Sequence, residues 1–242
     1  MIPLKDNIPS IRKPVVVVAI FVANLLAFLF EQSLPPGALY QFLHVYGAVP
    51  ARFTDPVWAQ QAGFPPGGWE AGLTYMFLHG GWLHFLLNMW VLWVFADNVE
   101  DALGHVRFLA FYLLSGLAAL GLHILFNMDS QMPVVGASGA IAGVMGAYFR
   151  LFPMARVVAL IPIIIIPWIV EVPAMLFLGI WFVIQVMSGL TSAGLAEGQS
   201  VAWWAHAGGF VFGMILVKRF GPLDCRYCYI PEDRAYDRRT GG

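Results

Sequence analysis

The chain has 242 residues, of which 60% are hydrophobic and only 11% are charged. This balance lies far from that of a soluble globular domain and indicates a protein embedded in a lipid bilayer. The formal net charge is −1. It shows none of the basic excess that nucleic-acid binding requires, so we expect no nucleic-acid partner.

Six charge-free runs are long enough to cross a bilayer as helices, which takes about 17–25 residues. The spans that we predict from them are residues 14–30, 73–96, 108–128, 134–152, 172–190 and 201–220. The sequence therefore predicts an all-α, polytopic membrane protein. A six-transmembrane-helix bundle is expected over residues 1–221, followed by a short charged cytoplasmic tail over residues 222–242.

Two further stretches lack the pattern of a span. Val157–Val170 is charge-free but shorter than the other runs, and Pro162 and Pro167 interrupt it. It fits an interfacial or re-entrant segment better than a full span. The first loop, from Glu31 to about Gly72, is rich in Pro, Gly and aromatic residues, which is consistent with an element lying in the membrane interface.

Basic residues collect on the cytoplasmic side of membrane proteins, so their distribution tests the number of spans. With six spans, all of the thirteen Lys and Arg residues except Arg52 fall on one side. Counting Val157–Val170 as a span would split them six to seven. Both termini are therefore predicted to be cytoplasmic. The run after Lys13 is interpreted as a retained first span, because Glu31 follows it where a signal peptide would have small residues.

Three of the predicted spans contain polar side chains, which are functional candidates because burying them in lipid is costly. Ser138 lies in the fourth span, His84 and Asn88 lie in the second, and His206 lies in the sixth. All three even-numbered spans begin at the outer surface. Ser138 and His206 would lie about 6 and 8 Å below it at a rise of about 1.5 Å per residue, so the sequence predicts that they share one depth.

Glycines line the two spans that carry Ser138 and His206. The fourth span has Gly136, Gly139, Gly143 and Gly146, and the sixth has Gly209 and Gly213 on the face of His206. Small residues at these spacings let two helix backbones approach closely. Helix packing alone would also account for them. Their pairing with Ser138 and His206 favours a contact close enough for a hydrogen bond between the two side chains.

This set of residues matches the chemistry of acyl transfer. A serine hydroxyl is a weak nucleophile that needs an adjacent base, and His206 would take its proton. His84 and Asn88 are one helical turn apart, so both can point at one oxygen. Together with the backbone N–H of Ser138 they would form an oxyanion hole. His79 is expected to be structural, its imidazole bonding to loop backbone around Gly80 and Gly81.

Three motifs in this order resemble the rhomboid family of intramembrane serine proteases. They are His79-Gly80-Gly81-Trp82-Leu83-His84-Phe85-Leu86-Leu87-Asn88, Gly136-Ala137-Ser138-Gly139 and His206-Ala207-Gly208-Gly209, and the opening Met1–Pro9 is similar to that of many prokaryotic members.

The resemblance covers nearly the whole chain through Phe220. It implies a compact six-helix fold in the cell (inner) membrane, a Ser138–His206 dyad without a third carboxylate, and no metal or cofactor. The expected partners are the lipid bilayer and single-span membrane proteins, which would be cleaved near their outer ends.

The chain departs from the family at two positions. Many members carry an aromatic residue one turn after the serine that stacks on the catalytic imidazole, and this chain has Ala142 there. Some members have Trp-Arg in the first outer loop, where this chain has Trp69-Glu70. The resemblance therefore does not say what orients His206.

Other functions fit the residues less well. A zinc protease would need His-Glu-x-x-His, aspartyl chemistry would need two carboxylates within the spans, and the Gly-x-Ser-x-Gly elbow fails at Ala140. A transporter would show a polar site at the midplane. The main alternative is an inactive rhomboid-like scaffold that binds membrane clients, although such relatives lose the serine or the histidine. Cys225 and Cys228 lack a second pair of zinc ligands and are expected to be reduced thiols.

Overall fold

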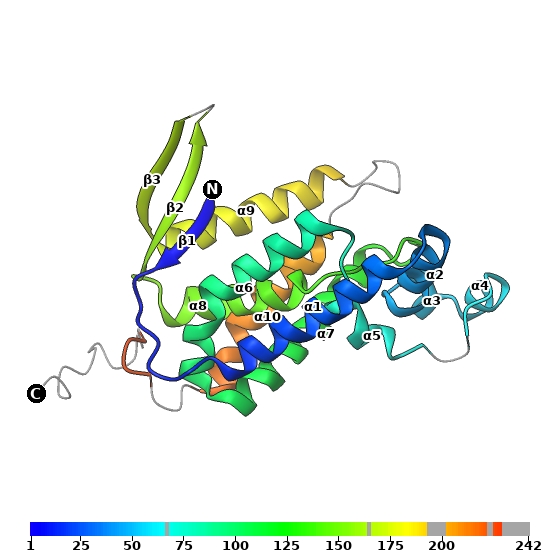
Figure 1. Cartoon of the computed structure of the whole chain (residues 1–242), viewed down its shortest axis with the longest axis horizontal. Helices are drawn as coiled ribbons and strands as arrows, with labels where there is room; N and C mark the ends of the chain where they lie inside the picture. Colours follow the sequence, from blue (N-terminus) through cyan, green and yellow to red (C-terminus); the bar gives the residue numbers. More distant parts are fainter. Residues whose placement is uncertain (66–67, 164–165, 193–201, 222–224, 229–242) are drawn as a thin grey trace, which may run out of the picture.

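The computed structural model describes residues 1–65, 68–163, 166–192, 202–221 and 225–228. Six helices of 14 residues or more form the bundle within these ranges: α1 (Val15–Ser33), α6 (Trp82–Leu103), α7 (His105–Phe126), α8 (Ser138–Leu151), α9 (Ala174–Ser192) and α10 (Trp203–Phe220). Shorter elements follow α1: α2 (Pro36–Tyr46), α3 (Pro50–Thr54), α4 (Pro56–Gln61), α5 (Ala71–Thr74) and the 3₁₀ turn η1 (Tyr75–Phe77). Figure 1 shows α2 to α4 at one end of the bundle and the strands at the other.

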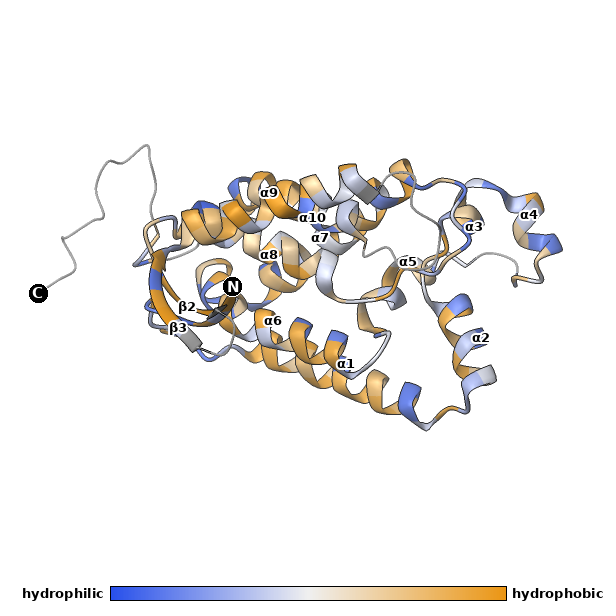
Figure 2. Ribbon diagram, turned by 90° about the horizontal axis from the view of Figure 1, so that it is seen from above, coloured by the Kyte–Doolittle hydropathy of each residue, from blue (hydrophilic) through white to orange (hydrophobic). Residues whose placement is uncertain are grey.

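Three of the described helices have the length and composition to cross a membrane, namely Val15–Ser33, His105–Phe126 and Ala174–Thr191. Figure 2 shows α1 and α9 as mostly hydrophobic ribbons. Helix α8 differs because it packs against α6, α7, α9 and α10, and nearly all of its residues are buried. Other helices surround α8 in place of lipid, and its small residues allow these helices to pack closely against it. The chain is a mostly helical polytopic membrane bundle, as the sequence predicted.

The second long helix corrects one predicted boundary. A span was predicted over residues 73–96, but α6 begins at Trp82 and continues to Leu103. The earlier residues form short turns, and Gly81 has a φ of 152°, which favours glycine. The helix continues past residue 96 because its carboxylates are bonded: Asp101 accepts from the backbone of Ile11 and Arg12, and Glu100 accepts from the first N–H groups of α1.

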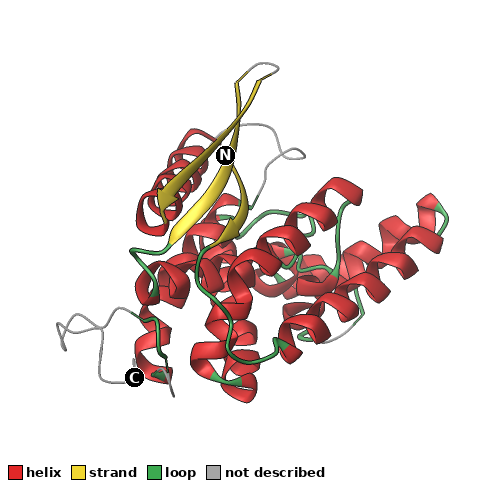
Figure 3. Ribbon diagram, turned by 60° about the vertical axis from the view of Figure 1, so that its left-hand side comes forward, coloured by secondary structure: helices red, strands yellow, loops and turns green. Residues whose placement is uncertain are grey.

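The segment at Val157–Val170, which was predicted to be interfacial or re-entrant, forms a β-hairpin. Strands β2 (Arg156–Ile163) and β3 (Ile166–Pro173) pair antiparallel, and β1 (Ile2–Asp6) pairs with β2 to complete the sheet, which projects from the bundle in Figure 3. The many Val and Ile residues favour strands. Pro162 opposes Pro167 beyond the part of β2 that pairs with β1, where a missing backbone donor is tolerated.

The cysteines also differ from the prediction of reduced thiols. Cys225 and Cys228 form a disulfide, their Cα atoms 5.4 Å apart, within the usual range for such a bond. Cys228 is buried against the core, so the turn at residues 225–228 is packed. The rest of the tail predicted over residues 222–242 lies outside the described residues.

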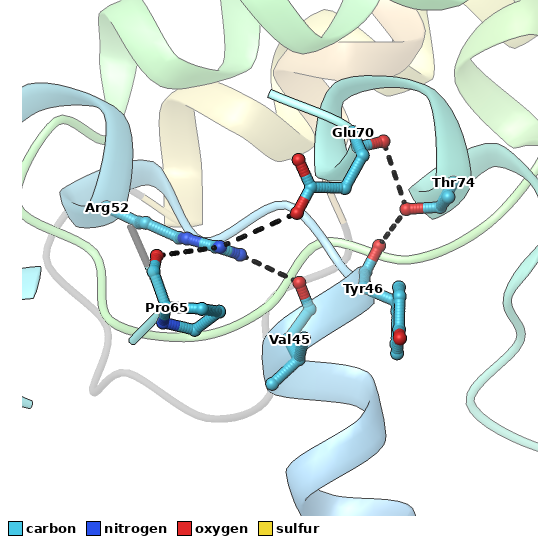
Figure 4. Close-up of polar contacts among 6 residues, drawn as sticks. All are labelled: Val45, Tyr46, Arg52, Pro65, Glu70 and Thr74. Carbon is cyan, nitrogen blue, oxygen red and sulfur yellow. Dashed lines mark hydrogen bonds and ion pairs between the residues drawn. The ribbon is translucent and has the colours of Figure 1, made fainter. Parts of the chain in front are cut away.

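The first loop is organised around Arg52, the one basic residue predicted on the outer side. Its guanidinium is buried and donates to Val45 O at 2.7 Å, with Pro65 O at 3.5 Å and the Glu70 carboxylate at 4.0 Å (Figure 4). Thr74 Oγ1 donates to Tyr46 O at 2.6 Å. Glu70, which departs from the family pattern, therefore faces an arginine supplied by another part of the loop.

This loop in turn holds the segment that leads to Ser138. Ala48 and Val134 exchange two backbone hydrogen bonds of 2.9 and 3.0 Å, and Ala51 N donates to Ser130 O. Gly136 N donates to Tyr75 O at 2.9 Å. The start of α8 is thereby tied to the first loop and to the turn before α6.

Candidate active site

Ser138 is the first residue of α8 and follows a backbone turn that only glycine fits well. Gly136 has a φ of 126°, in the region that favours glycine. A Cβ atom at Gly136 would lie 2.8 Å from the His84 ring and 3.6 Å from Asn88 Nδ2. Residues of α6 therefore lie directly against the approach to Ser138.

The structure brings Ser138 into contact with His206 near the start of α10. Ser138 Oγ lies 2.8 Å from His206 Nε2, within the range for a nucleophile and its base. On the other side of the ring, His206 Nδ1 lies 2.8 Å from the Gln185 Oε1 atom of α9. Three helices thus contribute to one chain of hydrogen bonds.

His84 and Asn88 lie on the same face of α6 and line the same cavity as Ser138. Gly80 N–H donates to His84 Nδ1 at 3.3 Å, so the other ring nitrogen, Nε2, carries the hydrogen and is a donor. Asn88 is buried, and its Nδ2 amide has no hydrogen-bond partner among the described residues. Both side chains therefore offer donors beside the serine.

The cavity has a volume of about 1030 Å³. It reaches from the Ser138–His206 pair to residues of the N-terminal strand and of α9, including Pro3, Trp181 and Gln185. A volume of this size is large enough for several side chains of an extended peptide. The site can therefore hold a polypeptide segment against a serine that is hydrogen-bonded to a histidine.

The predicted packing glycines do bring α8 and α10 together, but they do not all face α10. A Cβ atom at Gly209 would lie 2.1 Å from Gly139 O, and one at Gly213 would lie 2.0 Å from Gly143 O. The missing side chains of Gly139 and Gly143 point instead toward Ala119 and Ser115 of α7, and that of Gly136 points toward His84. The glycines of α8 therefore meet more than one neighbouring element, because α8 is enclosed on several sides.

His79 also differs from its predicted contacts. Its imidazole is buried and packs edge-on against Phe28 and Phe85. Its backbone N–H donates to the Glu31 carboxylate at 3.1 Å. The His79 imidazole was expected to bond to the loop backbone around Gly80 and Gly81, but the Gly80 N–H donates to His84 Nδ1.

Three residues near the pair were not singled out in the sequence. Gln185 bonds to His206, the Trp181 ring centroid lies 6.1 Å from that of His206, and His123 of α7 lines the cavity. All three lie in charge-free runs. A lone Gln in the fifth predicted span and a lone His in the third were the available signals, since polar side chains buried in membrane helices need a partner.

The structure is a helical membrane bundle in which a serine and a histidine are in contact inside a peptide-sized cavity. These features define a class of polytopic membrane proteins that carry the side chains needed for hydrolysis within the bilayer. The Rhomboid domain matches residues 66–222, which is more than half of the chain. The chain belongs to the rhomboid family.

Relatives from several lineages are similar to it. YdcA of Bacillus subtilis is 34% identical over 116 residues, which are 46% of this chain and 57% of YdcA. The mitochondrial Rhomboid protein 1 of Saccharomyces cerevisiae is 28% identical over 57% of this chain and 38% of its own length. Rhomboid protease GluP of B. subtilis is 40% identical over 34% of this chain and 15% of its own. Each match spans less than two thirds of the relative.

Proposed function

We propose that this protein is an intramembrane serine endopeptidase that cleaves single-span membrane proteins. The observation that carries the proposal is the 2.8 Å contact between Ser138 Oγ and His206 Nε2 within the cavity. Ser138 attacks the peptide carbonyl while His206 takes its proton, and His206 then returns the proton to the leaving amine. An inactive scaffold would have no need of this pair.

The oxyanion of the tetrahedral intermediate needs donors that are already in place. Asn88 Nδ2 and His84 Nε2 supply side-chain donors. The backbone N–H of Ser138, at the first turn of α8, has no partner within the helix and adds a third. Among the described residues Asn88 Nδ2 has no hydrogen-bond partner, which supports this role because a donor reserved for the transition state is free in the resting site.

Alanine at Asn88 or at His84 is expected to lower kcat by about 10–10³ each, with little change in KM, because the lost donor acts mainly in the transition state. Turnover of one model substrate in proteoliposomes measures both constants. A change confined to KM would instead identify the two residues as substrate-binding contacts. Alanine at exposed Trp93, on the same helix, serves as the control.

We infer that the enzyme is of the prokaryotic type and lies in the cell (inner) membrane, with six spans and both termini cytoplasmic. The opening Met1–Pro9 and the near one-sided distribution of basic residues support this arrangement. The N-terminal ends of α8 and α10 would then face outward, which puts Ser138 and His206 near the outer surface.

Cleavage is therefore expected near the outer end of a substrate span. The scissile bond must leave its helix to be attacked, because helical backbone is already hydrogen-bonded. Small residues at the cut and Gly or Pro nearby should increase the rate. Mass spectrometry of the products from an Ala/Gly-containing model span would locate the bond. A cut at the cytoplasmic end, or equal cutting of an uninterrupted poly-Leu span, would contradict both the topology and the mechanism.

Covalent labelling tests the nucleophile directly. A fluorophosphonate added to the full chain in liposomes should modify Ser138, and peptide mapping should find the adduct on that residue. The Ser138→Ala variant is the matched control and should stay unlabelled. A wild-type protein that is neither labelled nor active on the model span would refute the proposed function.

A further inference from the structure

Gln185 is a buried amide on α9 that contacts His206. The sequence predicted a dyad of Ser138 and His206 and did not include this contact. Only 5% of Gln185 is exposed. Its Oε1 atom lies 2.8 Å from His206 Nδ1, on the side of the imidazole opposite Ser138. The imidazole is therefore held at both nitrogens.

The two contacts define where the imidazole hydrogen lies. An amide oxygen can only accept, so His206 Nδ1 must donate. A neutral imidazole carries one hydrogen, which leaves Nε2 with a free lone pair directed at the Ser138 hydroxyl. This is the tautomer that a general base requires. The Gln185 Nε2 atom faces the Trp181 carbonyl at 3.5 Å, an orientation that turns Oε1 toward His206.

Among the residues that the structure describes, Gln185 is the hydrogen-bond partner of His206 Nδ1, and the other neighbours of the ring do not fix its tautomer. Ala142 is too small to stack on the imidazole, and the ring centroids of Trp181 and Trp203 lie 6.1 and 6.3 Å from it. These aromatic rings enclose the site but contribute no acceptor to Nδ1. A neutral amide also avoids the cost of burying a carboxylate in an apolar site.

We propose that Gln185 is a positioning residue that holds His206 in the reactive tautomer and orientation. The site is then a hydrogen-bonded series of Ser138, His206 and Gln185. This inference rests on the proposed function. Gln185 takes the place that an acidic residue has in three-residue serine hydrolase sites, and it acts through His206 without touching the substrate.

Two substitutions separate hydrogen bonding from packing. Gln185→Met keeps the length of the side chain and removes the acceptor, and kcat should fall about 10–10²-fold with KM nearly unchanged. Gln185→Glu keeps an acceptor oxygen in either ionisation state, and it should retain activity within about tenfold of wild type. Ile184→Met changes an exposed neighbour on the same helix and should leave both constants unchanged.

A spectroscopic measurement reads the contact without any turnover. Nitrogen-15 NMR of histidine-labelled full-length protein in detergent should show His206 Nδ1 protonated and Nε2 unprotonated, with the signal assigned from a His206→Gln sample. Gln185→Met should shift the signals toward a mixture of tautomers, whereas Gln185→Glu should preserve the wild-type pattern.

Two results would overturn the role of Gln185: a wild-type His206 protonated at Nε2, or a Gln185→Met variant with kcat within about twofold of wild type. Failure of the proposed function gives a different pattern, because Ser138 would then resist fluorophosphonate while the NMR spectra still report the Gln185–His206 contact.

Discussion

Replacing Ser138 or His206 with alanine is expected to abolish cleavage of a model single-span substrate. The two side chains act as one unit across a 2.8 Å contact, so the loss of either leaves no activated nucleophile. Turnover in proteoliposomes should fall below about a hundredth of the wild-type value. Helicity by circular dichroism and elution by size exclusion should stay unchanged, because neither side chain packs the core.

Two matched substitutions control for the chemistry of the mutated residue type. Ser33→Ala removes a hydroxyl at the exposed end of α1, and His44→Ala removes an imidazole on α2. Both should retain wild-type turnover. Residual cleavage above the stated level in either active-site variant would show that another nucleophile or base is at work.

Alanine at Gly209 is expected to abolish most of the proposed cleavage activity although the substitution touches no reacting atom. The added Cβ would lie 2.1 Å from Gly139 O, far inside contact distance, so α8 and α10 must separate. A displacement of about 1 Å at a catalytic contact can cost about 10² in rate. We expect a loss of that size for Gly209→Ala and complete loss for Gly209→Leu. Overpacking should also lower the free energy of unfolding by about 1–3 kcal/mol.

Gly121 provides the matched control on α7, because a Cβ atom there would have nothing within 4 Å. Gly121→Ala carries the same change in helix propensity and should keep full activity. Thermal unfolding of both variants in one detergent separates loss of stability from loss of geometry. Wild-type turnover in Gly209→Ala would mean that the close approach of α8 and α10 is not needed for the Ser138–His206 contact.

Most residues of the candidate site could be predicted from local sequence patterns. Each of the motifs around His84, Ser138 and His206 lies within a single predicted span, and their spacing follows the period of one helix. The charge-free runs likewise mark segments that lipid can surround, which is a property of composition. The mostly helical membrane fold was therefore accessible from the sequence alone.

The structure differs from the sequence predictions where the hydrogen-bonding groups of one segment are paired by a segment distant in the chain. The predicted span ended at residue 96, before the charge of Asp97, yet α6 continues to Leu103, where the N-terminal segment donates backbone hydrogen bonds to Glu100 and Asp101. Val157–Val170 lacks the length of a span, and β1 from the opposite end of the chain completes its sheet. Neither partner is near in sequence, so no local pattern could reveal them.

The sequence by itself determined that this chain is a membrane protein of the rhomboid type, and it pointed to a serine and a histidine as candidates for chemistry. Only the tertiary structure decided how that histidine is held. Gln185 lies on a helix without a recognised motif, and a buried amide can be assigned a partner only when the packing of α9 against α10 is known. The reason is physical: span hydrophobicity and helical spacing act within a segment, whereas hydrogen-bond geometry depends on how separate helices meet.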